Sequence, residues 1–111
     1  MNQNDPPTEH ILACLSSSPS NAKIVRTAAT MAKAFGGTFT ALYVRTPDSD
    51  QMGKEDCRRL QQHIRMAEQA GADISTIYGD DISQQIAEFA RISGITKIVL
   101  GRSSVHRRHF W

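Results

Sequence analysis

Short apolar runs alternate with amphipathic stretches along this chain, and each amphipathic stretch ends at glycine. The apolar runs show no clean alternation of polar and apolar side chains, as expected for parallel strands covered on both faces. Strands that alternate with helices in this way form a parallel sheet with right-handed crossovers. The pattern therefore predicts an α/β domain with an open parallel sheet of four strands and helices on both faces. The expected strands are His10–Leu15, Thr38–Val44, Asp73–Tyr78 and Ile95–Leu100.

The amphipathic stretches predict three helices. The first follows the turn Ser16–Asn21, where Ser20 or Asn21 could serve as N-cap, and it runs to the first glycine pair. The second is expected over Lys54–Ala70 and the third from Ile82 to the next glycine. In the first helix, apolar residues at helical spacing predict the buried face: Ile24, Ala28, Met31 and Phe35.

The length of 111 residues fits one domain, and the net charge of +2 gives no reason to expect a nucleic acid polymer as partner. We expect residues 1–9 to be a disordered lead-in or linker, residues 10–104 to form the domain, and residues 105–111 to be a basic tail. A fourth helix and a fifth strand would complete a common version of this fold, so the tail is expected to lead to a missing C-terminal part.

The cellular location is predicted from what the sequence lacks. Cys14 and Cys57 lie far apart and form no CxxC pair, which is typical of reduced thiols. The chain has no apolar run long enough to cross a bilayer and no visible signal peptide. We therefore expect a cytoplasmic domain, without direct membrane contact from this segment.

Loops that follow the strands are the first place to look for a ligand, because open parallel sheets bind ligands at the carboxyl ends of their strands. Ser16–Asn21 and Gly101–Ser104 are rich in small residues that let backbone N–H groups approach an anion. Arg102 could add a bidentate phosphate donor, and Tyr43, near the end of its strand, could stack on a base. The alternative for the serines is that they only form the turn and cap the helix.

The sequence gives no motif for a metal site or for catalysis. Asp80 and Asp81 could bind a metal, but acids before a helix are usually caps. No HExxH sequence, nucleophile elbow, Walker loop or dinucleotide fingerprint is present. His106 and His109 belong to a basic stretch that is most simply a solvated connector. We expect the domain not to be an enzyme and to contain no cofactor.

A likeness to known proteins extends from His10 to about Trp111 and is strongest in SSSPSNAK, FTALYV, YGDD and KIVLGRS. Over this range the chain resembles the universal stress protein family, and more closely the universal-stress-protein-like domain of potassium-sensor histidine kinases. The resemblance implies the universal-stress-protein fold, of the adenine-nucleotide alpha-hydrolase-like type. ATP-binding members end the first strand in aspartate, where this chain has Ser16. Their G-x2-G-x9-G-[ST] pattern matches here only at Gly101, because Ser104 takes the place of the second glycine.

The resemblance also implies a ligand. The pattern SxS-x20-FTAxY marks cyclic di-AMP binding in the kinase-associated domains, and this chain matches it without a gap. A cyclic dinucleotide offers two phosphates for the serine turn and two adenines for stacking. Phe39 and Ala41 are expected to shape the floor of the pocket. The candidate ligand-binding residues are Ser16, Ser18, Phe39, Thr40, Ala41, Tyr43, Arg102 and Ser103.

Three functions remain open at this stage. The first is a cyclic di-AMP-binding regulatory domain of a potassium-responsive sensor kinase, acting on the remaining domains of that kinase. The second is a scaffold that recruits a stress protein or a kinase segment through the charged face of the second helix or the basic tail. The third is an ATP-binding universal stress protein. The sequence leaves open whether the domain is a monomer or a homodimer.

Overall fold

The computed structural model describes residues 9–101, and its element order confirms the predicted alternation of strands and helices. Residues 1–8 and the basic tail, 105–111, lie outside the described residues, so the structure leaves the predicted domain limits untested. The strands are β1 (His10–Cys14), β2 (Thr38–Arg45), β3 (Asp73–Tyr78) and β4 (Lys97–Val99). The helices are α1 (Asn21–Phe35), α2 (Lys54–Gln69) and α3 (Ile82–Ile92), with a short 3-10 helix, η2 (Ser49–Gln51), in the loop after β2.

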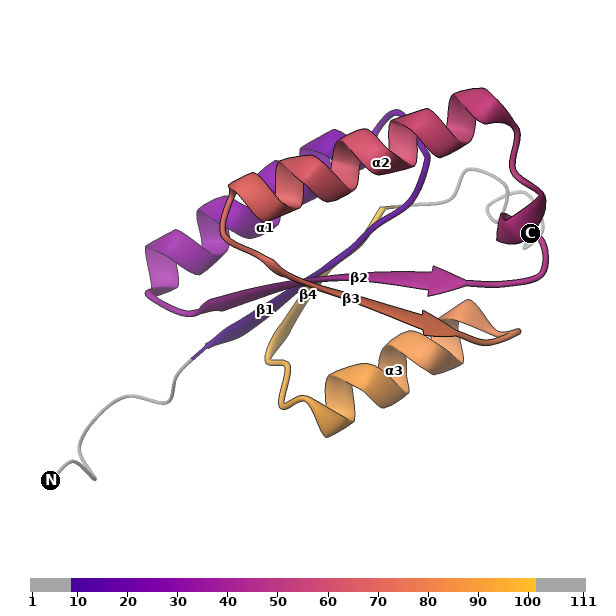
Figure 1. Cartoon of the computed structure of the whole chain (residues 1–111). Helices are drawn as coiled ribbons and strands as arrows, with labels where there is room; N and C mark the ends of the chain where they lie inside the picture. The colour runs from indigo at the N-terminus through magenta and orange to yellow at the C-terminus, as the bar shows by residue number, and fades with distance from the viewer. Residues whose placement is uncertain (1–8, 102–111) are drawn as a thin grey trace, which may run out of the picture.

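The four strands form one parallel sheet in the order β3-β2-β1-β4. Helices α1 and α2 cover one face of the sheet and α3 covers the other, as Figure 1 shows. The chain therefore moves outward from β1 to β3 and then returns to the opposite side of β1. This reversal of direction lies between β1 and β4, which is where open α/β sheets leave a crevice for a ligand.

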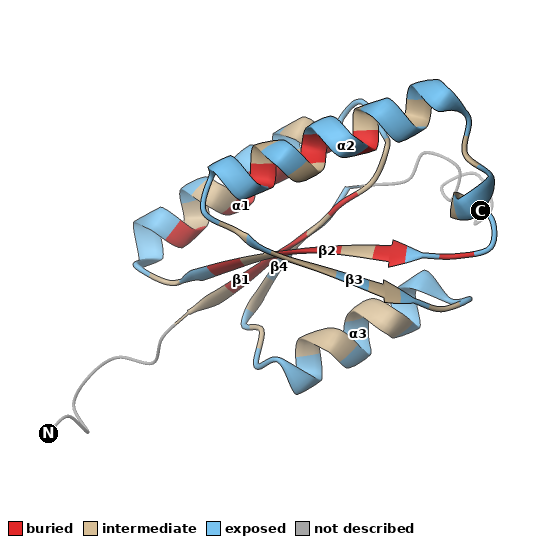
Figure 2. Ribbon diagram, viewed as in Figure 1, coloured by how far each residue is buried: buried red, intermediate tan, exposed pale blue. Residues whose placement is uncertain are grey.

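Two apolar cores lie on the two faces of the sheet. Successive residues of each strand point to opposite faces of the sheet, so neighbours in one strand belong to different cores. The upper core, under α1 and α2 in Figure 2, includes Ile11 of β1 and Ala41 of β2. The lower core, above α3, includes Leu12, Leu42 and Val44. The buried red segments in Figure 2 lie in β1, β2 and the inner faces of α1 and α2, while α3 is only partly buried.

The buried face of α1 differs from the prediction. Val25, Ala28 and Ala32 are the buried apolar residues of α1, whereas Phe35 is 50% exposed. The predicted stripe of large side chains lies beside the stripe that is actually buried. Small alanines in the buried stripe let α1 approach the sheet closely. Phe35 is the last residue of the helix, and the ammonium of Lys97 lies 5.2 Å from the centre of its ring.

The helix ends follow the predicted chemistry in two places. Gly36 ends α1 in the left-handed region, with φ of 63°, a conformation that side chains with a Cβ rarely adopt. Asp81 caps α3, and its Oδ1 accepts a hydrogen bond from the backbone N–H of Gln84 at 3.1 Å. The carboxylate at this helix start therefore acts as a cap, as predicted.

Candidate functional site

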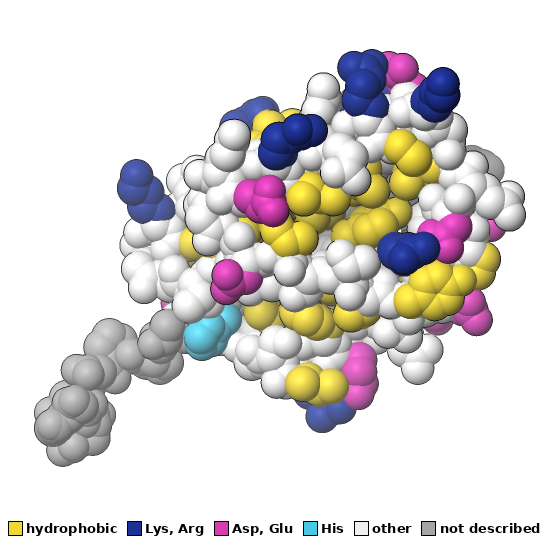
Figure 3. Space-filling model, in the orientation of Figure 1, with side chains coloured by type: hydrophobic (Ala, Val, Ile, Leu, Met, Phe, Trp, Pro, Cys, Tyr) yellow, Lys and Arg dark blue, Asp and Glu magenta, His cyan; other side chains and the backbone are white. Residues whose placement is uncertain are grey.

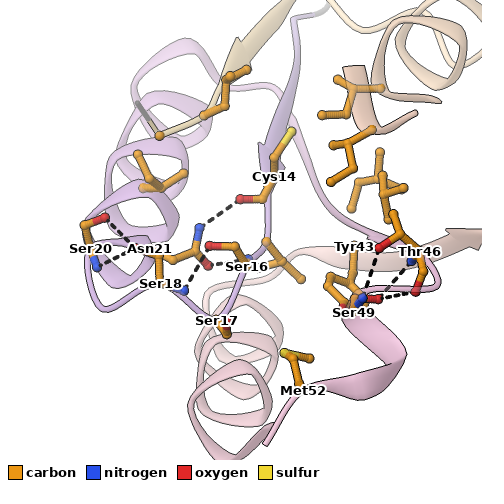
Figure 4. A pocket seen from close by; sticks show the side chains of 18 of the residues that line it. Cys14, Ser16, Ser17, Ser18, Ser20, Asn21, Tyr43, Thr46, Ser49 and Met52 are labelled. Carbon is orange, nitrogen blue, oxygen red and sulfur yellow. Dashed lines mark hydrogen bonds between the residues drawn. The ribbon is translucent and has the colours of Figure 1, made fainter. Parts of the chain in front are cut away.

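A cavity of about 820 Å³ lies where β1, β2 and β4 end. This volume is within the range of about 300–1,000 Å³ typical of small-molecule sites. Figure 4 shows the serine turn on one side of the cavity and the segment from Tyr43 to Ser49 on the other. Helix α3 contributes Ile82 and Ile86 to the lining, and the end of β4 contributes Leu100 and Gly101.

The serine turn, Ser16–Ser20, is held by hydrogen bonds between its own residues. The hydroxyl of Ser16 accepts the N–H of Ser18 at 3.2 Å, and the hydroxyl of Ser18 accepts the N–H of Ser20 at 3.4 Å. The Ser18 and Ser20 hydroxyls lie 3.0 Å apart. The serines thus form the turn, yet a hydroxyl that accepts an N–H keeps its own proton for donation to a ligand.

Asn21 fixes the start of this turn. Its side chain is 3% exposed, its Oδ1 accepts the N–H of Ser16 at 3.1 Å, and its Nδ2 donates to the carbonyl of Cys14 at 2.9 Å. Ser20 is the N-cap residue of α1, but neither it nor Asn21 makes the predicted side-chain cap. The asparagine instead ties the end of β1 to the helix.

Helix α2 supports the turn from below through two side chains. His63 is 4% exposed, and its Nδ1 lies 2.8 Å from the carbonyl oxygen of Ser16. Because a carbonyl can only accept, Nδ1 carries the proton. Arg59 donates from Nη1 to the carbonyl of Ser17 and to Asp56, each at 3.1 Å. Neither His63 nor Arg59 was predicted to support the turn, although their spacing of four residues places them on one helix face.

The loop after β2 forms the wall opposite the serine turn. The N–H of Thr46 donates to Ser49 Oγ at 2.8 Å, and the N–H of Ser49 donates to Thr46 Oγ1 at 3.0 Å. These reciprocal bonds fix the loop that leads into η2. Tyr43 precedes it, half-buried against the upper core. The structure thus brings Tyr43, Ser16 and Ser18 to one cavity.

Phe39, Thr40 and Ala41 do not line this cavity. Phe39 and Ala41 are packed into the upper core instead. Their expected contribution to the floor of the ligand site stays a prediction. Phe39 stands near the amino end of β2, where it borders a separate cavity of about 750 Å³ with Asp73. Leu42 and Val44, nearer the carboxyl end, line the site in their place.

Arg102 and Ser103, the remaining two predicted ligand-binding residues, lie outside the described residues. Among residues 9–101, Asp48 is the only charged side chain that lines the cavity. The positive end of α1 faces the same cavity, since Ser20 and Asn21 are part of its lining. An anionic ligand would therefore meet N–H groups and hydroxyls first, and would need a cation from elsewhere.

The thiol of Cys14 also lines the cavity. Burial raises the pKa of the Cys14 thiol to about 11, so the thiol stays protonated at neutral pH and is a poor nucleophile or metal ligand. Between residues 9 and 101, no three His, Cys, Asp or Glu side chains lie close enough together to hold a metal ion. None of the three helices is long and apolar enough to cross a bilayer in this part of the chain.

A comparison with protein families matches residues 7–110 to the universal stress protein family. The chain belongs to the universal stress protein family. Its four-stranded parallel sheet, with the cavity at the strand ends, is the fold that this membership implies. The resemblance drawn from SSSPSNAK, FTALYV, YGDD and KIVLGRS is confirmed.

The chain is also similar to two curated proteins that are both named sensor protein KdpD. The chain is 39% identical over 101 residues to sensor protein KdpD of Clostridium acetobutylicum, a match that covers 91% of this chain. It is 30% identical over 97 residues to sensor protein KdpD of Escherichia coli, covering 87% of this chain. Each match spans only 11% of the relative's length. The chain is thus similar to one segment of a sensor protein.

Solved structures of universal stress proteins share the fold. One from Burkholderia pseudomallei superposes with a TM-score of 0.67 at 20% identity, covering 93% of this chain and 89% of that one. A universal stress protein in complex with cAMP gives 0.63 at 16% identity, with coverage of 84% and 71%. One from Archaeoglobus fulgidus in complex with dAMP gives 0.57 at 22% identity, with coverage of 91% and 87%.

Proposed function

We propose that this domain is a ligand-sensing regulatory module of a KdpD-like, potassium-responsive sensor kinase, and that it binds cyclic di-AMP in the cavity at the strand ends. One observation carries the proposal. The first half of the SxS-x20-FTAxY sequence lies in the turn after β1 and the second half lies in β2, and Ser16 and Ser18 meet Tyr43 across one cavity.

The cavity offers a suitable group for each part of such a ligand. The hydroxyls of Ser16 and Ser18 and the amino end of α1 can receive a phosphate. Tyr43 can stack on an adenine, a contact worth about 1–3 kcal/mol per base. Arg102, which follows the lining residue Gly101 in the sequence, is the proposed phosphate cation.

The known relatives support an adenine-containing ligand. Two of the solved universal stress proteins named above are complexes, one with cAMP and one with dAMP, and both ligands are adenine nucleotides. ATP is less well supported, because Ser16 replaces the aspartate and Ser104 the second glycine of ATP-binding members. We assign the domain no catalytic step of its own.

Regulation would follow from unequal binding to two states. A ligand that binds one conformation better than another shifts the population toward the first. In the proposed parent kinase this shift would pass from the cytoplasmic domain to the remaining domains. A homodimer of this domain is compatible with the proposal but is not needed for it.

Calorimetric titration of the domain with cyclic di-AMP tests the proposal, with ATP and cyclic di-GMP as controls. We expect cyclic di-AMP alone to bind, with a dissociation constant in the micromolar range or tighter. Absence of binding by a sample whose circular dichroism shows it to be folded would overturn the proposal. The serine turn would then be structural only, and a protein-recruiting scaffold would become the leading function.

A further inference from the structure

The cavity at the strand ends continues around the edge of the sheet. Its lining includes Leu42, Tyr43 and Val44, three consecutive residues of β2, and both Cys14 and Leu15 at the end of β1. Side chains of consecutive strand residues point to opposite faces of a sheet. The lining also includes Ile24 of α1 and Ile86 of α3, which pack against the cores on opposite faces of the sheet, so the cavity extends over both faces.

The two parts of the cavity are apolar and belong to different cores. On the side of α1 and α2, Ile24, Tyr43 and Met52 line it and pack against the upper core, and we call this part the upper lobe. On the side of α3, the lining includes Val44 and Ile86 of the lower core.

The part on the side of α3, the lower lobe, is defined by Val44, Ile82 and Ile86. It is open to solvent at its rim, because Ile82 is 49% exposed and Leu100, which also lines the cavity, is 53% exposed. A ligand that covers the exposed apolar surface of a cavity removes it from water, and this burial favours binding.

We propose that the lower lobe is a second base-binding site, so that the cavity takes a ligand with two purine bases, one in each lobe. The serine turn, which lines the same cavity at the end of β1, would hold the phosphates that join the bases. This inference deepens the proposed function and rests on it for the identity of the ligand. A mononucleotide would fill one lobe at a time and leave the other exposed.

The lobes can be observed separately by NMR of methyl-labelled protein. The δ1-methyl of Ile86 reports on the lower lobe and the ε-methyl of Met52 on the upper lobe. Titrated AMP is expected to shift both methyls, each with its own dissociation constant. Cyclic di-AMP is expected to shift both along one shared 1:1 isotherm. The inference is overturned if neither nucleotide shifts the Ile86 methyl.

A matched pair of variants on α3 provides a second test. Ile82→Ala removes apolar wall from the lower lobe and is expected to weaken cyclic di-AMP binding by roughly tenfold, with the Met52 shift caused by AMP unchanged. Ile92→Ala, on the same helix but 68% exposed and outside the lining, is expected to leave the affinity within about twofold. Equal affinities of the two variants would contradict a base in the lower lobe.

Comparing the AMP and cyclic di-AMP titrations separates the proposed function from the proposed base site in the lower lobe. Binding of AMP at Ile86 without any binding of cyclic di-AMP would refute the proposed function and keep the lower lobe as a base site. Binding of cyclic di-AMP that shifts Met52 and leaves Ile86 unchanged would keep the proposed function and refute the lower lobe.

Discussion

Tyr43 is a single residue that belongs both to the packing of the fold and to the proposed ligand site. Its ring packs against the upper core, yet it also lines the cavity opposite the serine turn. Its neighbours Leu42 and Val44 point to the other face of β2. A substitution at Tyr43 therefore changes the cavity wall on the side of α1 and α2 and does not remove the side chains of Leu42 and Val44 on the other side.

Replacing Tyr43 by alanine is expected to weaken cyclic di-AMP binding by roughly 5-fold to 150-fold, the equivalent of about 1–3 kcal/mol for one stacked base. Tyr43→Phe keeps the ring and is expected to bind within about twofold of the wild type. Calorimetric titration of both variants measures this difference. Tyr78→Ala is the matched control, because Tyr78 is 57% exposed and does not line the cavity. Equal affinities of the Tyr43→Ala variant and the wild type would exclude stacking on this ring.

Cys14 leads to a prediction about pH. Burial raises the pKa of its thiol to about 11, while Cys57 lies exposed on α2. At pH 8 a thiol reagent is therefore expected to label Cys57 first and Cys14 much more slowly. Because the folded state holds this proton more tightly than the unfolded state, the contribution of Cys14 to stability is lost as the pH rises from about 9 towards 11. Mass spectrometry of labelled peptides shows the order in which the two thiols react. Faster labelling of Cys14 than of Cys57 would contradict the burial of Cys14.

The sequence showed which residue types could meet a ligand but not which of them would face the cavity. Strand alternation places Tyr43 and Phe39 on the same face of β2, as observed. The sequence also places Phe39 toward the other end of the strand, but only the folded sheet shows that it borders a different cavity there. The sequence suggested only a capping role for Asn21. Its bonds to Ser16 and Cys14 depend on how the turn closes, which the sequence does not show.

At the scale of elements, α2 holds the serine turn in place from outside the cavity. His63 and Arg59 do not line the cavity, but both bond to carbonyls of the turn. They act as positioning residues in this arrangement. On the face drawn in Figure 3, charged side chains lie scattered and hydrophobic side chains gather between α2 and the sheet.

Replacing His63 by leucine removes the bond to Ser16 while keeping similar bulk. We expect amide hydrogen exchange of Ser16 and Ser18 to accelerate by roughly tenfold, the equivalent of one net hydrogen bond of about 0.5–1.5 kcal/mol. His63→Asn offers an N–H donor near the position of Nδ1 and is expected to restore slow exchange. Leu60→Ala, one turn earlier in the same helix, should lower the melting temperature without selectively loosening the turn. Unchanged exchange in the His63→Leu variant would show that the turn is rigid without α2.

The types and approximate limits of the elements were predictable, because apolar runs, helical spacing and glycine stops are local signals. The buried face of α1 was not. A stripe of large apolar residues ending at Phe35 and a stripe of smaller ones through Ala28 and Ala32 lie side by side on the helix. The distance between α1 and the sheet decides between them, and that distance is a property of packing.

At the scale of the whole molecule, the site depends on the order of the strands. The alternation of strands and helices predicts parallel strands, but it does not place β4 beside β1 rather than beside β3. Because β4 lies beside β1, Gly101 and the serine turn border the same cavity. The predicted contributions of Arg102 and Ser103 lie outside the described residues and stay predictions.

The most direct test of the account is a titration of isotopically labelled protein with cyclic di-AMP, followed through the backbone amide signals. We predict dose-dependent shifts for Ser16–Asn21, for Tyr43–Met52 and for Gly101, with the signals of Gly71 and Asp73 unchanged. Shifts gathered around Gly71 and Asp73 would place the ligand in the cavity at the opposite end of the sheet. A folded protein whose spectrum does not change at all would contradict cyclic di-AMP as its ligand.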